Sequence, residues 1–310
     1  MQLEGIHHIS AITGDAARNL DFYTRVLGLR LVAKTVNQDD PSVYHLFYAD
    51  EQGRPGSELT FFEYSRANPG RPGAGMVHTI VWRLGTPDAL GFWVQRLGAG
   101  GVDAERSADS IAFSDFEGLR HEFKVSDSAD TPLSAEHPEI PADYATQGFE
   151  GVRAYSRVPE MSSALLERVM GARRVADAAW ELRGEVRGAT ITYDTAPGPR
   201  GIPSAGTVHH VAWGTSAAQH PRWAERVNAA GIHSSGIVDR HYFHSIYFRE
   251  PSGVLFEIAD DAPGFTVDVP LDQLGSVIIL PPRLEAHRDL IEANLTPLPD
   301  PRAAWKASAR

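Results

Sequence analysis

The sequence repeats itself, and this repetition constrains the fold more than any other feature. The segment Leu3–Ser10 (LEGIHHIS) resembles Phe149–Ser156 (FEGVRAYS), and the likeness continues downstream. A second pair also matches, Ala74–Trp82 (AGMVHTIVW) with Ala205–Trp213 (AGTVHHVAW). Because these landmarks recur in the same order, the chain is predicted to consist of four copies of one structural unit.

The first copy shows what the unit is. Gly5 to Ile12 is apolar and β-prone, Asp15 is a plausible N-cap, and Gly28 stands where a glycine ends a helix. Three strands should follow, separated by Asp, Gly and Pro turns, near 29–36, 43–48 and 59–64. The unit is therefore β-α-β-β-β. The four copies are expected at about 3–66, 74–126, 147–196 and 205–261.

These units predict an α+β fold in which four βαβββ modules form two curved-sheet, barrel-like domains. Residues 1–126 would hold modules one and two, and residues 147–262 modules three and four. Between them, 127–146 is a linker rich in Ser, Asp, Pro and Ala. The tail, 263–310, is expected to contain one helix, at about 283–295, between prolines.

Composition excludes several classes of function. The chain of 310 residues has no cysteine, so disulfides, thiolate nucleophiles and cysteine metal sites are excluded. A net charge of −11 disfavours nucleic acids and anionic membranes as partners. The N-terminal segment has no signal-peptide pattern, and no apolar run reaches the ~18 residues of a membrane helix. A cytoplasmic protein is expected.

The histidines, thirteen in number, are the candidates for chemistry. In the register that the repeats define, four first-strand positions are equivalent: His8, Thr79, Ala154 and His210. In the last strands, Glu257 is equivalent to Glu122. Two histidines and one carboxylate on one face are the facial triad of non-haem iron(II), which leaves about three coordination sites open. His8, His210 and Glu257 are therefore the candidate ligands.

An ordinary structural role competes with this interpretation. A histidine in a strand is often only a core residue, whereas a carboxylate in a buried-looking run such as that around Glu257 is costly unless it is paired or bound to metal. Glu122 follows Arg120 and is interpreted as structural. Five further histidines have no equivalent acid partner and are assigned to the surface or the core: His45, His121, His220, His233 and His287.

Four such modules, a first-strand histidine and Pro251–Glu257 (PSGVLFE) in a last strand resemble the vicinal-oxygen-chelate superfamily. That superfamily includes glyoxalase I and the extradiol dioxygenases, and the closest likeness is to its hydroquinone-type ring-cleaving dioxygenases. Ordinary two-domain extradiol enzymes take their first histidine from module three, where this chain has Ala154. The hydroquinone type takes it from module one, which matches His8.

The resemblance implies a site and a reaction. Its metal would be Fe(II), with Mn(II), Zn(II) or Ni(II) as alternatives in purified protein, held by His8, His210 and Glu257. The residues implied in catalysis are His7, Ser10, His209, Arg240 and Tyr247. The implied activity is extradiol-type ring cleavage of a hydroquinone or related aromatic diol by dioxygen. The partners are thus a small aromatic substrate and O2, with no nucleic acid and no membrane, and a homo-oligomer is left open.

Two other readings of the sequence remain. A glyoxalase I-like isomerase would need a fourth ligand, for which Glu63 or Glu58 is near; Gly56 plus four residues is Thr60, which argues against both. The chain could also be a small-molecule-binding protein without activity. In the dioxygenase interpretation, the ligands come from modules one and four. These two modules are therefore predicted to share one curved sheet, and modules two and three to share another.

Overall fold

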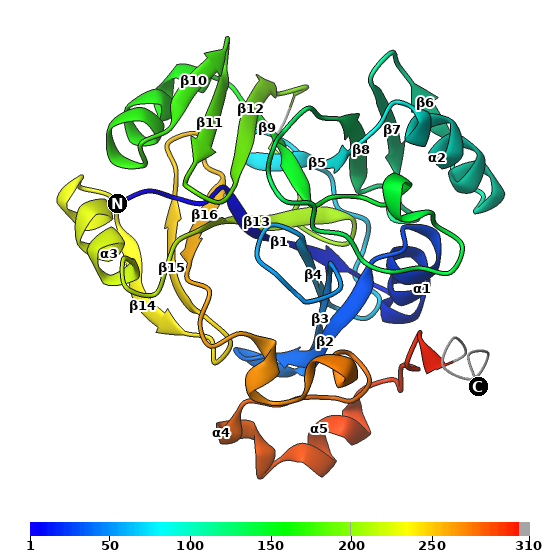
Figure 1. Cartoon of the computed structure of the whole chain (residues 1–310). Coiled ribbons are helices and arrows are strands. Elements are labelled where there is room, and N and C mark those ends of the chain that lie inside the picture. Colours follow the sequence, from blue (N-terminus) through cyan, green and yellow to red (C-terminus); the bar gives the residue numbers. More distant parts are fainter. Residues whose placement is uncertain (199, 304–310) are drawn as a thin grey trace.

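The computed structural model describes residues 1–198 and 200–303 and shows an α+β fold (Figure 1). Its strands form two eight-stranded sheets, and its few helices lie at the margins of these sheets. Each unit runs from a strand through a helical segment to three further strands. The predicted four βαβββ modules are therefore confirmed.

The first sheet contains modules one and four in the strand order β14-β15-β16-β13-β1-β4-β3-β2. Module one consists of β1 (Ile6–Thr13), α1 (Ala16–Asp21), a π-helical turn (Phe22–Val26), β2 (Arg30–Asn37), β3 (Asp40–Ala49) and β4 (Glu58–Glu63). Module four consists of β13 (Thr207–Gly214), α3 (His220–Ala229), β14 (Ser234–Asp239), β15 (His244–Arg249) and β16 (Leu255–Ala259). The predicted pairing of modules one and four is confirmed.

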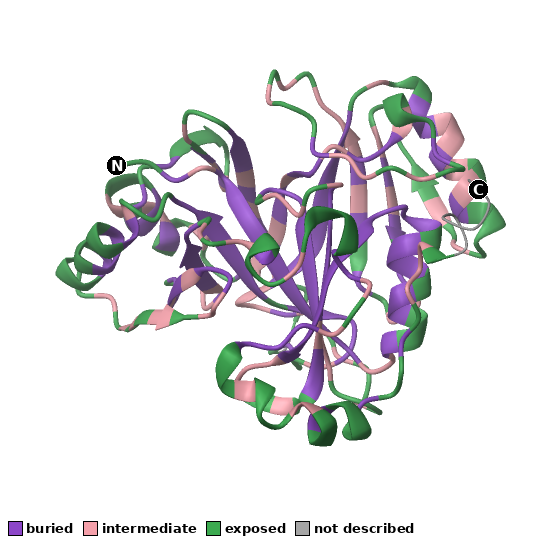
Figure 2. Cartoon of the chain, turned by 60° about the horizontal axis from the view of Figure 1, so that its bottom comes forward, coloured by how far each residue is buried: buried purple, intermediate pink, exposed green. Residues whose placement is uncertain are grey.

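The two first strands lie side by side at the centre of this sheet. Strand β1 is antiparallel to β13, with Ser10 opposite His210, and each of the two strands runs parallel to the last strand of its own module. All eight residues of β1 are buried, and Figure 2 shows buried strands through the middle of the molecule with exposed residues on the outer helices. Side chains at this junction are thus held in packed surroundings.

The second sheet repeats the arrangement with modules two and three, in the order β10-β11-β12-β9-β5-β8-β7-β6. Module two consists of β5 (Met76–Leu84), α2 (Asp88–Ala99), β6 (Ala104–Arg106), β7 (Ser110–Ser114) and β8 (Arg120–Val125). Module three consists of β9 (Phe149–Ser156), a 3₁₀ turn (Pro159–Ser162), a π-helical turn (Leu165–Val169), β10 (Arg173–Ala176), β11 (Ala179–Arg183) and β12 (Gly188–Thr195).

An arginine at equivalent positions of α2 and α3 joins successive modules. Arg96 donates to the backbone oxygens of Arg25 and Val26, where the helical segment of module one ends. Arg226 donates to the oxygen of Arg168, the counterpart of Arg25 in module three. Helix ends leave carbonyl groups without partners, and these side chains satisfy them. The repeated arginines therefore fix module two against module one, and module four against module three.

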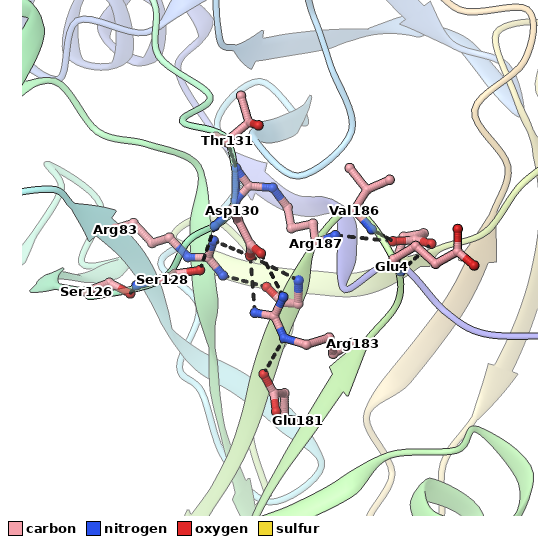
Figure 3. A network of polar contacts seen from close by, with 12 residues as sticks. Glu4, Arg83, Ser126, Ser128, Asp130, Thr131, Glu181, Arg183, Val186 and Arg187 are labelled. Carbon is pink, nitrogen blue, oxygen red and sulfur yellow. Dashed lines mark hydrogen bonds and ion pairs between the residues drawn. The ribbon is translucent and has the colours of Figure 1, made fainter.

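The linker is hydrogen-bonded to both module two and module three (Figure 3). Asp130 accepts hydrogen bonds from Arg83 of β5 at 2.6 Å and from Arg183 of β11 at 2.7 Å. The guanidinium of Arg83, whose side chain is 5% exposed, also donates to Glu150 and to the Gly188 oxygen. The linker thus completes a partly buried charge network that ties β5 to β9, β11 and β12 of module three.

The tail departs from its prediction. In place of one helix at 283–295, it has α4 (Pro282–Glu285) and α5 (Arg288–Asn294), interrupted at Ala286 and His287. The tail packs on module one, where Lys34 donates to the Leu298 oxygen and the Tyr44 hydroxyl to the Thr296 oxygen. Within the described ranges, no helix has the length and apolar character that crossing a membrane requires.

Candidate metal centre

Three buried side chains from three strands converge on one point of the first sheet. His8 lies in β1, His210 in β13 and Glu257 in β16. His8 Nε2 lies 3.3 Å from His210 Nε2 and 3.2 Å from Glu257 Oε2. His210 Nε2 lies 2.9 Å from the same carboxylate oxygen. The structure therefore brings together the three side chains selected as candidate ligands.

The spacing of these donor atoms fits one octahedral metal ion. Two ligands at right angles, each about 2.1 Å from an ion, lie about 3.0 Å apart. Separations of 2.9, 3.2 and 3.3 Å match three such mutually adjacent ligands. Glu257 Oε1 has no hydrogen-bond partner among the described residues, and a buried carboxylate without one is costly unless a cation offsets it. The donor set thus fits a divalent metal.

The charge of Glu257 suits the same role. Burial by itself would raise the pKa of this carboxyl, but His8 and His210 beside it hold the pKa well below its usual range. Burial lowers the pKa of His210. A charged carboxylate and a neutral imidazole are the forms that bind divalent metals.

His7 determines which nitrogen of His8 is available. The backbone oxygen of Asp260 lies 2.9 Å from His7 Nε2, so this nitrogen carries the proton of its ring. Burial lowers the pKa of His7 to about 3, which keeps the ring neutral. His7 Nδ1 must then accept, and His8 Nδ1, 3.0 Å away, must donate. The bare Nε2 of His8 consequently faces Glu257 and His210.

The contact recurs in module four with one difference. His209 Nδ1 lies 2.7 Å from His210 Nδ1. When His210 offers Nε2 to a metal, its Nδ1 carries the proton and donates to His209. His209 Nε2, unlike that of His7, has no hydrogen-bond partner within the described chain, and the exposed ring borders a cavity. His7 is thus anchored by a backbone oxygen, whereas its counterpart His209 is accessible.

That cavity, of about 330 Å³, opens beside His8 and His210. Tyr247 and Arg240 line it, and Arg240 Nε donates to the Tyr247 hydroxyl at 3.2 Å. Burial, followed by nearby Glu257, raises the pKa of Tyr247, so the hydroxyl keeps its proton. Arg240 Nη1 also bonds Asp39, 3.0 Å away in the β2–β3 hairpin. The predicted residues Arg240 and Tyr247 therefore face the same space as the candidate ligands.

Ser10 belongs to a chain of hydroxyl and imidazole groups in the cavity wall. Its Oγ lies 2.7 Å from Thr60 Oγ1, which lies 2.9 Å from His45 Nε2. His45 borders the cavity between Phe47 and Phe62, each with its ring centre 4.1 Å from that of His45. His45 had been assigned to the surface or core because it lacks an equivalent acid. Its place at the site is a feature that the repeat register could not reveal.

Glu58 and Glu63, the two candidate fourth ligands, lie elsewhere. Glu63 accepts from the backbone amide of Ala16, at the start of α1. Glu58 Oε2 lies 3.6 Å from His7 Nδ1, on the Nδ1 side of the His8 ring, and burial raises its pKa well above the usual range. Neither carboxylate belongs to the group of His8, His210 and Glu257, although Glu58 forms a second group of donors with His7 and His8.

In the second sheet, the equivalent positions hold no such group among the described residues. Thr79 and Ala154 replace the two histidines. The neighbouring His78 bonds Asp194 at 2.9 Å, and Glu122 is half-buried in the wall of a separate cavity. Only the first sheet thus carries the complete set of donors in the part of the chain that is described.

Comparisons with known proteins find a family model and several relatives that this chain resembles. The family model "Glyoxalase/Bleomycin resistance protein/Dioxygenase superfamily" matches residues 5–124 and 148–258. The Bacillus subtilis protein named "Putative ring-cleaving dioxygenase MhqA" is 37% identical over 96% of this chain and 100% of its own length. The chlorohydroquinone/hydroquinone 1,2-dioxygenase of Sphingobium indicum is 31% identical over 93% of this chain and 94% of its own.

The fold is also similar to those of solved structures. A crystal structure of a "putative dioxygenase" from Bacillus subtilis has a TM-score of 0.90 at 37% identity and covers 96% of this chain and 98% of its own. Glyoxalase I from maize has a TM-score of 0.59 at 16% identity, covering 83% of this chain and 92% of its own, a likeness that concerns the fold alone.

Proposed function

Because this chain belongs to the glyoxalase/bleomycin resistance protein/dioxygenase superfamily, we propose that it is a metal-dependent dioxygenase that opens the ring of a hydroquinone or related aromatic diol. The observation that carries the proposal is the group of three donors, His8, His210 and Glu257, beside a cavity that the two histidines line. Iron(II) bound there supplies a Lewis acid for a ring hydroxyl and a route for electrons between ring and dioxygen.

The cavity favours a flat aromatic ring. Phe47, Phe62 and Phe243 line it, and the ring centre of Phe243 lies 5.1 Å from that of His8. Apolar walls around a few polar groups are the usual build of a small-molecule site. In this setting the aromatic side chains exclude water and hold the substrate ring beside His8 and His210.

Arg240 and Tyr247 act on substrate oxygen. Both are donors aimed into the same space, one a permanent cation and the other a neutral hydroxyl. Donors fixed in advance stabilise negative charge that develops on oxygen during a reaction. His209 moves a proton, since its ring borders the cavity while its Nδ1 contacts His210.

Ring opening between a hydroxyl-bearing carbon and its neighbour follows from the para arrangement of a hydroquinone, whose two hydroxyl-bearing carbons are not adjacent. The glyoxalase-like alternative is less well supported. In module four, Glu257 of β16 lies opposite Ala212 of β13. At the equivalent place in module one, Thr60 of β4 lies opposite Ser10 of β1. Thr60 therefore stands where a fourth ligand, a carboxylate, would be needed. A neutral hydroxyl there leaves a three-ligand site.

The deciding experiment is an oxygen electrode with iron(II)-loaded protein. Hydroquinones, catechols and a hemithioacetal are supplied side by side. We expect oxygen uptake with hydroquinones, in a ratio of one O2 to one diol, with both oxygen atoms recovered in the product. Anaerobic conversion of the hemithioacetal alone would replace this proposal by the isomerase. If none of these compounds is converted, the result would favour a small-molecule-binding protein without activity.

Replacing Tyr247 by Phe is expected to lower kcat by about 100-fold, the usual cost of removing one donor to a developing oxygen charge. Arg240→Gln should have a similar effect. Iron content should stay at that of the unchanged protein in both variants, because neither side chain is among the three donors. Activity and metal content are measured on the same samples.

Asp39→Asn provides the matched control. This substitution removes the negative charge of Asp39, the hairpin residue that Arg240 contacts, but leaves the Arg240–Tyr247 contact in place. We expect a much smaller loss of kcat than in Arg240→Gln. Equal losses in both variants would mean that Arg240 serves only to hold the hairpin.

A further inference from the structure

A second cavity, of about 450 Å³, lies where the two sheets meet. Arg157, Arg200 and Arg249 line it, and no Asp or Glu is among its described lining residues. The neighbouring Glu250 is buried, and its carboxylate is occupied by the Ser162 hydroxyl and by the backbone amides of Ser252 and Val254. Three cations thus gather without a facing acid in a chain whose net charge is −11.

This cavity adjoins the candidate metal centre through a third, smaller one. The connecting cavity, of about 130 Å³, shares Arg249, Met76 and Pro203 with the arginine-lined cavity. At its other end it shares His209, His210 and Leu255 with the substrate cavity. The three cavities therefore form a row that runs from the arginines through the connecting cavity to His209 and His210.

The arginine-lined cavity also has apolar walls. Val158 and Met161, which line it, are 51% and 56% exposed. Cations beside apolar surface suit a small organic anion, whose carboxylate faces the guanidinium groups while its carbon chain lies on the apolar wall.

The proposed reaction produces such an anion. Dioxygen adds both its atoms to the diol and is reduced, while the bond between the hydroxyl-bearing carbon and its neighbour breaks. The first of these carbons becomes a carboxylic acid and the second an aldehyde, which balances atoms and electrons. At neutral pH the acid loses its proton to water, so a neutral substrate becomes an anionic product.

We propose that the arginine-lined cavity receives the carboxylate product and gives it a way out separate from the substrate cavity. This inference rests on the proposed function. Arg249 lines the connecting cavity together with His209 and His210, and it also lines the arginine-lined cavity. Arg157 and Arg200 lie beyond it, at exposed positions.

The test uses sorbate, an unreactive six-carbon unsaturated monocarboxylate, as a stand-in for the product. Its dissociation constant is measured by calorimetry with iron-loaded protein and without oxygen. Arg157→Glu/Arg200→Glu should weaken binding by about tenfold or more, and added salt should weaken binding to the unchanged protein. The charge-matched control Arg168→Glu/Arg222→Glu alters two exposed arginines outside the row and should bind sorbate normally.

Unchanged sorbate binding in Arg157→Glu/Arg200→Glu would overturn the inference. So would complete loss of binding in Glu257→Ala, because the anion would then sit on the metal. Because sorbate binding needs no turnover, the two proposals fail separately. An inactive protein whose sorbate binding depends on these arginines contradicts the dioxygenase and leaves the cavity as a carboxylate site. An active protein without that dependence contradicts only the product route.

Discussion

Protein in which His8, His210 or Glu257 is replaced by alanine is expected to retain no stoichiometric iron(II). Each side chain supplies one of three donor atoms that lie 2.9 to 3.3 Å apart. Loss of a partner that only orients a ligand weakens metal binding by about 10–100-fold, so loss of a ligand itself should exceed that range. Iron is measured after anaerobic loading and gel filtration.

Two further variants test whether the loss of iron is specific to the three ligands. Glu122→Ala changes the equivalent carboxylate of the second sheet and should keep its iron. His7→Ala removes the ring that fixes the His8 proton at Nδ1 and should bind iron about 10–100-fold more weakly. One iron per chain in His8→Ala would refute the ligand assignment.

Asp130→Ala is expected to lower the free energy of unfolding by about 3 kcal/mol, the scale for breaking a buried ion pair on one side. The side chain of Asp130 is 7% exposed, and Arg83, its partner, would keep only Glu150 and one carbonyl. Asp127→Ala, an exposed change in the same linker, is the control and should alter stability by less than about 0.5 kcal/mol. Both are measured by urea unfolding of the full chain.

The pH dependence of this difference has a definite sign. Burial raises the pKa of Asp130, but contacts with Arg183 and Arg83 hold this pKa well below its usual range. A carboxyl whose folded pKa is depressed contributes stability above its unfolded pKa, and that stability is lost as pH falls towards the folded value. The unfolding curves of the unchanged protein and Asp130→Ala should therefore approach each other below about pH 4. A constant gap down to pH 3 would contradict the pairing.

The repeats made much of the fold predictable. They placed His8 and His210 in equivalent strands and identified Glu257 as a last-strand carboxylate, and chemistry then required modules one and four to be neighbours. What they could not show depends on contacts between distant segments. His45 borders the cavity and contacts Thr60 of another strand, and Asp39 contacts Arg240, 201 residues away in sequence. Such contacts leave no period in the sequence.

The tail shows a second limit. Its apolar spacing and flanking prolines indicated a single helix, but the helical hydrogen bonding is interrupted near His287. Short helices gain most of their stability from tertiary packing, here that of α5 against β3, and Lys34 and Tyr44 hold the segment that follows α5. Local propensity alone therefore could not decide where these helices end.

The pairing of β1 with β13 also has a consequence for biosynthesis. His8 and His210 are 202 residues apart. At about 5–20 residues per second, a ribosome needs on the order of 10–40 s to make the chain between them. Throughout that interval the β13-facing side of β1 is an open strand edge, able to pair with other nascent chains. The centre therefore cannot form before module four has been synthesised, and contacts this far apart in sequence favour slow folding.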